Sequence, residues 1–400
     1  MNKLLNDFLR YVAIDTQSDE ESETSPSTFK QYDLLKLLEN EFKELGVECE
    51  LDKFGRLYAH IPGENGSCCV GLCAHVDTAS ECSGANVKPQ VIYNYDGKDI
   101  KLGESGLVLS PNDYKKLTEC VGKTIITTDG NTLLGGDDKA GVAIIMDIVR
   151  GHLELPIKER RPLAVLITPD EEIGRGPDHF DLEKYGCKFG YTIDGDYPWI
   201  INIENFNAMS CQVKITGKAI HPGEGKEKLL NAALIFTEFA SLLPNDQIPY
   251  KTSGHEGFNH LVYINGTVEE AIGQYILRNH DQKLLEQQVK DFENVKALIE
   301  NKYPGVKVDL TFKNQYKNMV EIIKEHPECV DEIVSVFKEL GIKYEFEPIR
   351  GGTDGATFSF LGCPSPNLGT GTYNHHGRSE FGVLEEMKLM YNILLELLKK

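Results

Sequence analysis

The chain has 400 residues, 40% of them hydrophobic, and a formal net charge of −20, so it is long enough for two domains of ordinary size. Nucleic acid and anionic membranes repel so acidic a protein, and neither is expected as a partner. Asp7 and Arg10 interrupt the N-terminal apolar residues and the other apolar runs are too short to span a bilayer, which predicts a cytoplasmic protein.

Ten cysteines are spread along the chain without a C-x-x-C pair. Most lie in apolar runs such as "SCCVGLCAH" and "FLGCP". This setting predicts reduced, buried thiols in a reducing compartment, and no thiolate zinc cluster.

The first half of the chain alternates between helical and strand patterns. The acidic stretch 16–27 is expected to form a solvated loop, and helical spacing predicts a helix over 29–45 that ends at Gly46. Compact apolar runs predict buried strands over 68–74, 162–169 and 190–194, and a helix runs from "GGDD" to about 154. The alternation indicates an α/β sheet with helices on its faces.

The pattern changes after Phe206. Strands are predicted over 210–216, 260–266, 271–281 and 306–314, and helices over 227–243 and 283–300. This β-α-β-β-α-β order is typical of a ferredoxin-like unit. A helix over 328–340, strands at "YEFEPI" and "ATFSFLG" and a helix from 384 then return to the α/β pattern. We therefore predict a small domain, 208–317, inserted between the two parts of a larger one, 1–207 and 318–400.

Polar side chains follow each predicted buried strand of the larger domain. His75 and Asp77 follow the first, Asp170, Glu171 and Glu172 the second, and Asp194 ends the third. Each group alone is an ordinary surface turn, but the carboxyl ends of parallel strands meet at one edge, where ligands bind. Carboxylates crowded there would repel one another unless cations lay between them.

Two further motifs belong to the same edge, "GGDDKAG" at 135–141 and "YNHHG" at 373–377. The adjacent aspartates alone are explained by an N-cap and the helix dipole; beside the other groups, one can bridge two metal ions while the next caps the helix. Histidine and carboxylate ligands without thiolate suit zinc, cobalt or manganese. In "HVD", Asp77 can accept from the second nitrogen of His75.

The motifs "AHVDT", "GGDDKAG", "TPDEEIG", "TIDG", "HPG", "RGGTDG" and "YNHHGRSEF" occur in an order that runs nearly end to end. In this the chain resembles the peptidase T family, the tripeptide aminopeptidase branch of the dinuclear-zinc aminopeptidase and carboxypeptidase superfamily. The resemblance implies a zinc-peptidase catalytic domain with a mixed sheet and helices on both faces. It also implies that the inserted domain is a lid, or a surface through which a homodimer forms.

The resemblance also implies roles for named residues. Two Zn²⁺ ions, replaceable by Co²⁺ or Mn²⁺, would be held by His75 and Asp194 at the first site, by Glu172 and His376 at the second, and by Asp137 between them. Asp77 would orient His75, and Glu171 would be the general base. His221 would reach from the lid to the tetrahedral intermediate. Arg278, and Arg350 in the Gly-rich loop of the catalytic domain, would bind the substrate, including its terminal carboxylate.

Two positions depart from the family pattern. Asn279 follows Arg278 where the family usually has an aspartate, which weakens the assignment of Arg278. His375 stands beside His376; His376 is preferred because it directly precedes glycine, and His375 is the alternative.

Three functions remain open. The first is a metallo-aminopeptidase that removes the N-terminal residue of tripeptides with a water activated by two zinc ions. The second is a dinuclear-metal dipeptidase or N-acyl amino acid amidohydrolase, and the third is a non-enzymatic relative that binds peptide or metal. The complete ligand set and Glu171 argue against the third, and the resemblance favours the first.

Overall fold

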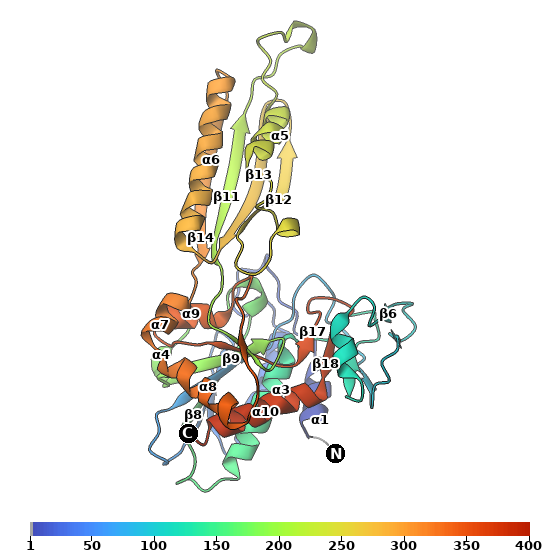
Figure 1. Cartoon of the computed structure of the whole chain (residues 1–400), viewed down its shortest axis with the longest axis vertical. Helices are drawn as coiled ribbons and strands as arrows, with labels where there is room; N and C mark the ends of the chain where they lie inside the picture. Colours follow the sequence, from blue (N-terminus) through green and yellow to red (C-terminus); the bar gives the residue numbers. More distant parts are fainter. Residues whose placement is uncertain (1–2) are drawn as a thin grey trace. The chain divides into compact units, whose positions relative to one another are not determined.

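The structure is a computed structural model that describes residues 3–400, and the chain divides into two compact units (Figure 1). Unit 1 runs up to Ile203 and includes Glu321–Glu347 and Thr353–Lys400, and unit 2 comprises Glu204–Val320 and Pro348–Gly352. Unit 2 thus extends beyond the predicted 208–317 at both ends and takes in a segment that the sequence assigned to the larger domain. Among the helices of residues 3–400, none has the length and hydropathy needed to cross a bilayer.

Unit 1 is built on an eight-stranded sheet with the order β1-β2-β8-β3-β9-β16-β10-β15. Neighbouring β8, β3, β9 and β16 are parallel, whereas β1, β2 and β10 run antiparallel to a neighbour, so the sheet is mixed. The strands are β1 (Glu48–Leu51), β2 (Leu57–Ile61), β3 (Val70–His75), β8 (Leu163–Thr168), β9 (Phe189–Gly195), β10 (Ile200–Asn202), β15 (Glu345–Phe346) and β16 (Asn367–Gly369).

Helices cover both faces of this sheet. Tyr185 and Phe358, from α4 and α9, pack against Cys73 and Leu166, while α3 contacts β3 and β9 and is itself contacted by α1 and α10. Every residue of β3 and β8 is buried, as strands covered on both faces require. The helices are α1 (Lys3–Val12), α2 (Gln31–Glu44), α3 (Gly136–Leu153), α4 (Leu182–Tyr185), α7 (Val320–Glu325), α8 (Glu328–Glu339), α9 (Asp354–Phe360) and α10 (Leu384–Leu397).

A second sheet of unit 1, with the order β17-β18-β7-β4, was not predicted. It consists of β4 (Gln90–Ile92), β7 (Ile125–Thr127), β17 (Thr372–Tyr373) and β18 (Phe381–Val383), and a separate hairpin pairs β5 (Ile100–Lys101) with β6 (Val108–Leu109). The turn that carries the two adjacent histidines lies between the paired strands β17 and β18. This pairing therefore fixes both ends of the histidine turn.

Unit 2 has the predicted β-α-β-β-α-β order and an antiparallel sheet, β12-β13-β11-β14. Helices α5 and α6 contact each other and pack on the sheet, where Phe236, Phe239, Tyr275 and Phe292 share one buried cluster. The elements are β11 (Asn207–Thr216), α5 (Ala232–Leu242), β12 (Phe258–Gly266), β13 (Glu270–Asn279), α6 (Gln282–Lys302) and β14 (Lys307–Tyr316).

Two local predictions were wrong. "ATFSFLG" is not a strand but most of helix α9; Phe358 is buried while Phe360 is exposed, whereas a strand would place both on one face. A short apolar run does not distinguish helix from strand by its periodicity. The stretch 16–27 is a loop but is not fully solvated, because Ser18 and Ser27 are buried and hydrogen-bonded.

Six of the ten cysteines are buried, and all ten are free thiols. The sulfur atoms of Cys187 and Cys363 lie 3.5 Å apart. The expectation that most of the thiols are buried is confirmed, and their reduced state in a reducing compartment stays a prediction.

Candidate metal centre

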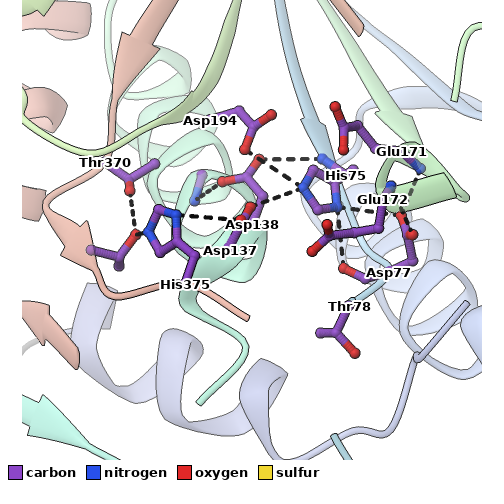
Figure 2. Close-up of polar contacts among 12 residues, drawn as sticks. His75, Asp77, Thr78, Asp137, Asp138, Glu171, Glu172, Asp194, Thr370 and His375 are labelled. Carbon is purple, nitrogen blue, oxygen red and sulfur yellow. Dashed lines mark hydrogen bonds and ion pairs between the residues drawn. The ribbon is translucent and has the colours of Figure 1, made fainter. Parts of the chain in front are cut away.

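Three neighbouring parallel strands deliver side chains to one edge of the large sheet (Figure 2). His75 is the last residue of β3 and pairs with Thr168, the last residue of β8. Glu171 and Glu172 follow β8 in the short 3-10 helix η2 (Glu171–Ile173), and Asp194 lies near the end of β9. The convergence expected from the strand ends is therefore present.

Asp170 shapes the turn that carries the two glutamates. Its backbone is in the left-handed region, with φ +60°, a conformation that residues other than glycine adopt at some cost in free energy. Its carboxylate accepts hydrogen bonds from Ser27 N at 2.7 Å, Ser27 Oγ at 2.5 Å and Gln31 Nε2 at 2.7 Å. These bonds tie the turn to the 27–31 segment and hold it in that conformation.

His75 is held on one side and faces carboxylates on the other. Its Nδ1 lies 3.1 Å from the backbone O of Asp77 and 3.3 Å from Oδ1 of the same residue. Its Nε2 lies 3.1 Å from Oδ1 of Asp137 and 3.5 Å from Oδ1 of Asp194. The Asp77 carboxylate also accepts from the backbone N–H of Glu171 at 2.9 Å and of Glu172 at 3.2 Å. Asp77 thus fixes both the imidazole and the glutamate turn.

The two aspartates of "GGDDKAG" face different neighbours at the start of α3, and the peptide bond between them is cis. Asp137 places Oδ1 near His75 and Oδ2 3.4 Å from Nε2 of His376. Asp138 instead accepts from Gly141 N at 3.1 Å, as a helix cap does, and from His75 N at 3.3 Å. One aspartate therefore lies between His75 and the histidines of the β17–β18 turn, while the other stabilises the backbone.

Both histidines of the β17–β18 turn reach the site. Nε2 of His376 lies 2.9 Å from Oε2 of Glu172. His375 places Nδ1 3.4 Å from Asp137 Oδ2 (Figure 2). The same Nδ1 lies 3.5 Å from Asp196 Oδ1, and Nε2 of His375 lies 3.0 Å from Thr372 Oγ1. The contact with Glu172 distinguishes His376 from His375.

The site holds an excess of buried carboxylates, which favours a cation. Burial raises the pKa of Glu172 to about 7 and that of Asp194 to about 6, and the charge of Asp137 adds to both shifts. Burial opposes the charged form of His75, yet its carboxylate neighbours raise its pKa well above the ordinary value. The charge of Asp137 thus disfavours ionisation of Glu172 and Asp194, whereas the neighbouring histidines hold the pKa of Asp137 itself well below its ordinary value.

The donor set also fits metal ions. Ligand atoms of His75, Asp137 and Glu172 lie within 4.8 Å of one another, as do those of His75, Glu171 and Asp194. Oε1 of Glu172 is buried and has no hydrogen-bond partner among residues 3–400, although such an atom ordinarily has one. Imidazole and carboxylate donors at this spacing are suited to divalent first-row metals.

Two further buried acids, Asp354 and Glu380, lie near the site and were not predicted from the sequence. Asp354, at the start of α9, accepts from Thr168 Oγ1 at 3.0 Å, and burial raises its pKa to about 7. Glu380 accepts from three backbone N–H groups of the 134–137 segment. Asp354 lies in the motif "RGGTDG" and Glu380 in "YNHHGRSEF". Nothing in the spacing of either motif separates these two acids from ordinary surface carboxylates.

The other three predicted site residues belong to unit 2. His221 is exposed, and its Nδ1 accepts from Gly223 N at 3.2 Å. Arg278, on β13, is 9% exposed, donates to Leu277 O at 3.0 Å and lies over the ring of Tyr316.

Arg350 also belongs to unit 2 and not, as predicted, to a loop of the larger domain. Its guanidinium donates to Gly254 O at 2.6 Å, Glu256 O at 2.9 Å and Thr252 Oγ1 at 3.0 Å. These bonds hold it to the 252–256 segment, a pairing between distant parts of the chain that motif order does not reveal.

Comparisons with known proteins agree with this architecture. The family model described as peptidase family M20/M25/M40 matches residues 127–400. The chain is 43% identical over 402 residues to peptidase T of Desulfitobacterium hafniense, covering 100% of this chain and 98% of the relative. It is 42% identical, with the same coverage, to peptidase T of a Geobacillus species.

Solved structures show the same fold. Aminopeptidase PepT of Bacillus cereus superposes with a TM-score of 0.77 at 22% identity, covering 99% of this chain and 97% of that one. A tripeptidase of Staphylococcus aureus gives a TM-score of 0.76 at 23% identity, with the same coverage. On the full-length identity to its relatives and the family match, the chain belongs to peptidase family M20/M25/M40, within the group of proteins named peptidase T.

Proposed function

We propose that the protein is a metal-dependent aminopeptidase that releases the N-terminal residue from tripeptides. The observation that carries the proposal is the placement of Asp137, whose Oδ1 lies 3.1 Å from His75 Nε2 and whose Oδ2 lies 3.4 Å from His376 Nε2. The length of the substrate is inferred from the relatives, which are named peptidase T, and from the S. aureus protein, which is described as a tripeptidase.

The proposed centre holds two divalent cations, which we assign as zinc. His75 and Asp194 would bind one ion, Glu172 and His376 the other, and Asp137 both. The short contact between His376 and Glu172 and the unpartnered Oε1 of Glu172 support the second site. Ions bound in this way polarise a peptide carbonyl and lower the pKa of water.

Glu171 is proposed as the general base. Its carboxylate would take a proton from the attacking water and pass it to the leaving amine. Burial raises its pKa well above the ordinary value for glutamate, and the bond from its backbone N–H to Asp77 fixes its position. A group with a raised pKa accepts protons more readily near neutral pH. The closeness of Glu171 to His75 and Asp194 leaves one competing role, that of a further ligand.

The residues of unit 2 are proposed to bind the substrate. Arginine suits a peptide's terminal carboxylate because its planar guanidinium can donate two parallel hydrogen bonds and stays charged. We assign this role to Arg278 and Arg350, and a contact with the reacting carbonyl to His221. The lid or dimerisation role of unit 2 and the cytoplasmic location stay predictions.

The test is hydrolysis of a matched set: a dipeptide, a tripeptide, its C-terminal amide, a tetrapeptide and an N-acyl amino acid. We expect the free tripeptide to be cleaved fastest, and amidation to cost about 2 kcal/mol or more in transition-state binding, because one partner of a charged pair is lost. Equal rates on the tripeptide, its amide and the tetrapeptide would contradict tripeptide selection. Preference for the dipeptide or the N-acyl amino acid would establish the amidohydrolase alternative.

A further inference from the structure

Glu380 lies between the histidine turn and β18, is 1% exposed, and directs its carboxylate at the backbone that precedes α3. Its Oε2 accepts from Leu134 N at 2.7 Å and from Gly135 N at 2.8 Å, and its Oε1 accepts from Asp137 N at 3.1 Å. Both oxygens are therefore bonded to the segment that leads to Asp137.

The local sequence is shaped around this contact. Gly135 has φ +80°, a conformation that glycine adopts without strain. A Cβ placed on Gly136 would lie 3.0 Å from Glu380 Oε1 and 2.9 Å from Thr372 Cγ2, so glycine at this position lets the carboxylate approach the backbone. The two glycines of "GGDDKAG" thus allow Glu380 to bond to the N–H of Asp137.

The bond to Asp137 N also fixes the point from which the side chain of Asp137 projects. That side chain directs its two oxygens to imidazoles from different parts of the chain: Oδ1 to His75 on β3, and Oδ2 to His375 and His376 on the histidine turn. A carboxylate that must face two partners tolerates little rotation of its backbone. Glu380 follows His376 by four residues in the chain. Its bond to Asp137 N therefore connects the bridging aspartate to the turn that carries His376.

We propose that Glu380 is a positioning residue that holds Asp137 in its bridging geometry and thereby sets the affinity of the metal centre. The proposal rests on the proposed function, because it takes Asp137 to be the shared metal ligand. Glu380 itself would bind neither metal nor substrate. Residues that orient metal ligands typically change metal affinity about tenfold to a hundredfold when they are replaced.

A merely structural role is the alternative, since a Glu380 variant leaves at least one of the three buried N–H groups without its acceptor. Glu385 offers a matched control, because its carboxylate likewise accepts from backbone, Thr124 N at 2.8 Å, and from Thr124 Oγ1 at 3.0 Å. Among residues 3–400, the carboxylate of Glu385 bonds to Thr124 and not to the 134–138 segment. Glu385 is exposed and accepts from one backbone N–H rather than three, so its replacement removes a smaller carboxylate–backbone contact without acting on Asp137.

The experiment compares wild type, Glu380→Gln and Glu385→Gln in two measurements: unfolding by urea of the metal-free protein, and Zn²⁺ affinity from competition with a chromophoric chelator. Both variants are expected to lose stability. Only Glu380→Gln is expected to lose Zn²⁺ affinity, by about tenfold or more, because its amide cannot accept all three bonds.

Wild-type Zn²⁺ affinity in Glu380→Gln, or equal losses of affinity in the two variants, would overturn the positioning role. If Glu380→Gln does not fold, Gly136→Ala displaces the carboxylate without changing it, and its expected result is the same loss of affinity; unchanged affinity there would also overturn the proposal. Failure of wild type itself to bind Zn²⁺ would instead overturn the proposed metal centre, so the two failures are distinguishable.

Discussion

Oδ1 of Asp77 lies 3.3 Å from Nδ1 of His75, on the side of the imidazole away from the other carboxylates. The same Asp77 carboxylate accepts from the backbone N–H groups of Glu171 and Glu172. A single buried side chain therefore orients one proposed ligand and the turn that carries another ligand and the general base.

Replacing Asp77 by asparagine is expected to lower metal affinity and turnover, each by about tenfold to a hundredfold, because the imidazole loses its charged partner. Asp281 is a matched control: its carboxylate also accepts from two backbone N–H groups, those of Lys283 and Leu284, but it caps α6 in unit 2. Asp281→Asn should leave metal affinity unchanged. Equal metal affinity in wild type and Asp77→Asn would contradict the orienting role.

The two adjacent glutamates should respond in opposite ways. Glu171→Gln is expected to lower turnover at least about a hundredfold, in line with loss of a general base, while bound metal stays near the wild-type level. Glu172→Gln is expected to lose metal, because Glu172 faces both His376 and Asp137. The metal content of each purified variant shows which glutamate is the ligand. Loss of metal in Glu171→Gln and its retention in Glu172→Gln would assign the ligand to Glu171 and the base to Glu172.

Arg350 should stabilise the segment to which its guanidinium is bonded. Arg350→Ala removes three hydrogen bonds to Thr252, Gly254 and Glu256, so backbone amides of this segment are expected to exchange faster with deuterium. Arg160→Ala is the control, since Arg160 also donates to two backbone carbonyls, but in unit 1. Unchanged exchange over 252–256 in Arg350→Ala would show that these bonds do not order the segment.

His152 should make the metal-free protein less stable in acid. It is fully buried, its Nε2 lies 2.8 Å from Arg161 O, and burial lowers its pKa below the ordinary 6.5. At a pH between the two values of its pKa, His152 is protonated in the unfolded chain but neutral in the folded one. The stability that the neutral, buried His152 contributes is therefore present above the unfolded pKa and is lost as the pH falls toward the folded pKa.

The measurement is urea unfolding of wild type and His152→Gln, with chelator present, from about pH 8 to pH 5. The stability advantage of wild type is expected to shrink as the pH falls through about 6.5, since glutamine does not titrate. An advantage that is constant over this range would contradict the prediction.

Much of the larger domain could be predicted because its buried strands are compact apolar runs that end in polar residues. The strands β3, β8 and β9 were identified within a few residues of their bounds, and parallel pairing then brings His75, Glu172 and Asp194 to one edge. The β-α-β-β-α-β order of unit 2 could be predicted for the same reason. Alternation of period two marks its strands, and the amphipathic helices have period 3.6.

The remaining features depend on contacts between distant segments. The pairing of β18 with β7 and the bonds from Glu380 to the 134–137 segment join residues more than two hundred positions apart. Arg350 joins unit 2 through bonds to backbone carbonyls, which have no sequence signal. The proposed metal ligands could therefore be predicted better than the contacts that hold them in place.

The most direct test of the account is the position of metal ions around Asp137 in crystals of the zinc-loaded protein, located by anomalous diffraction at the zinc absorption edge. The account predicts two ions about 3.5–4 Å apart, one beside His75 and Asp194, the other beside Glu172 and His376, with an oxygen of Asp137 bonded to each. A single ion, no ion, or two ions that do not share Asp137 would contradict it.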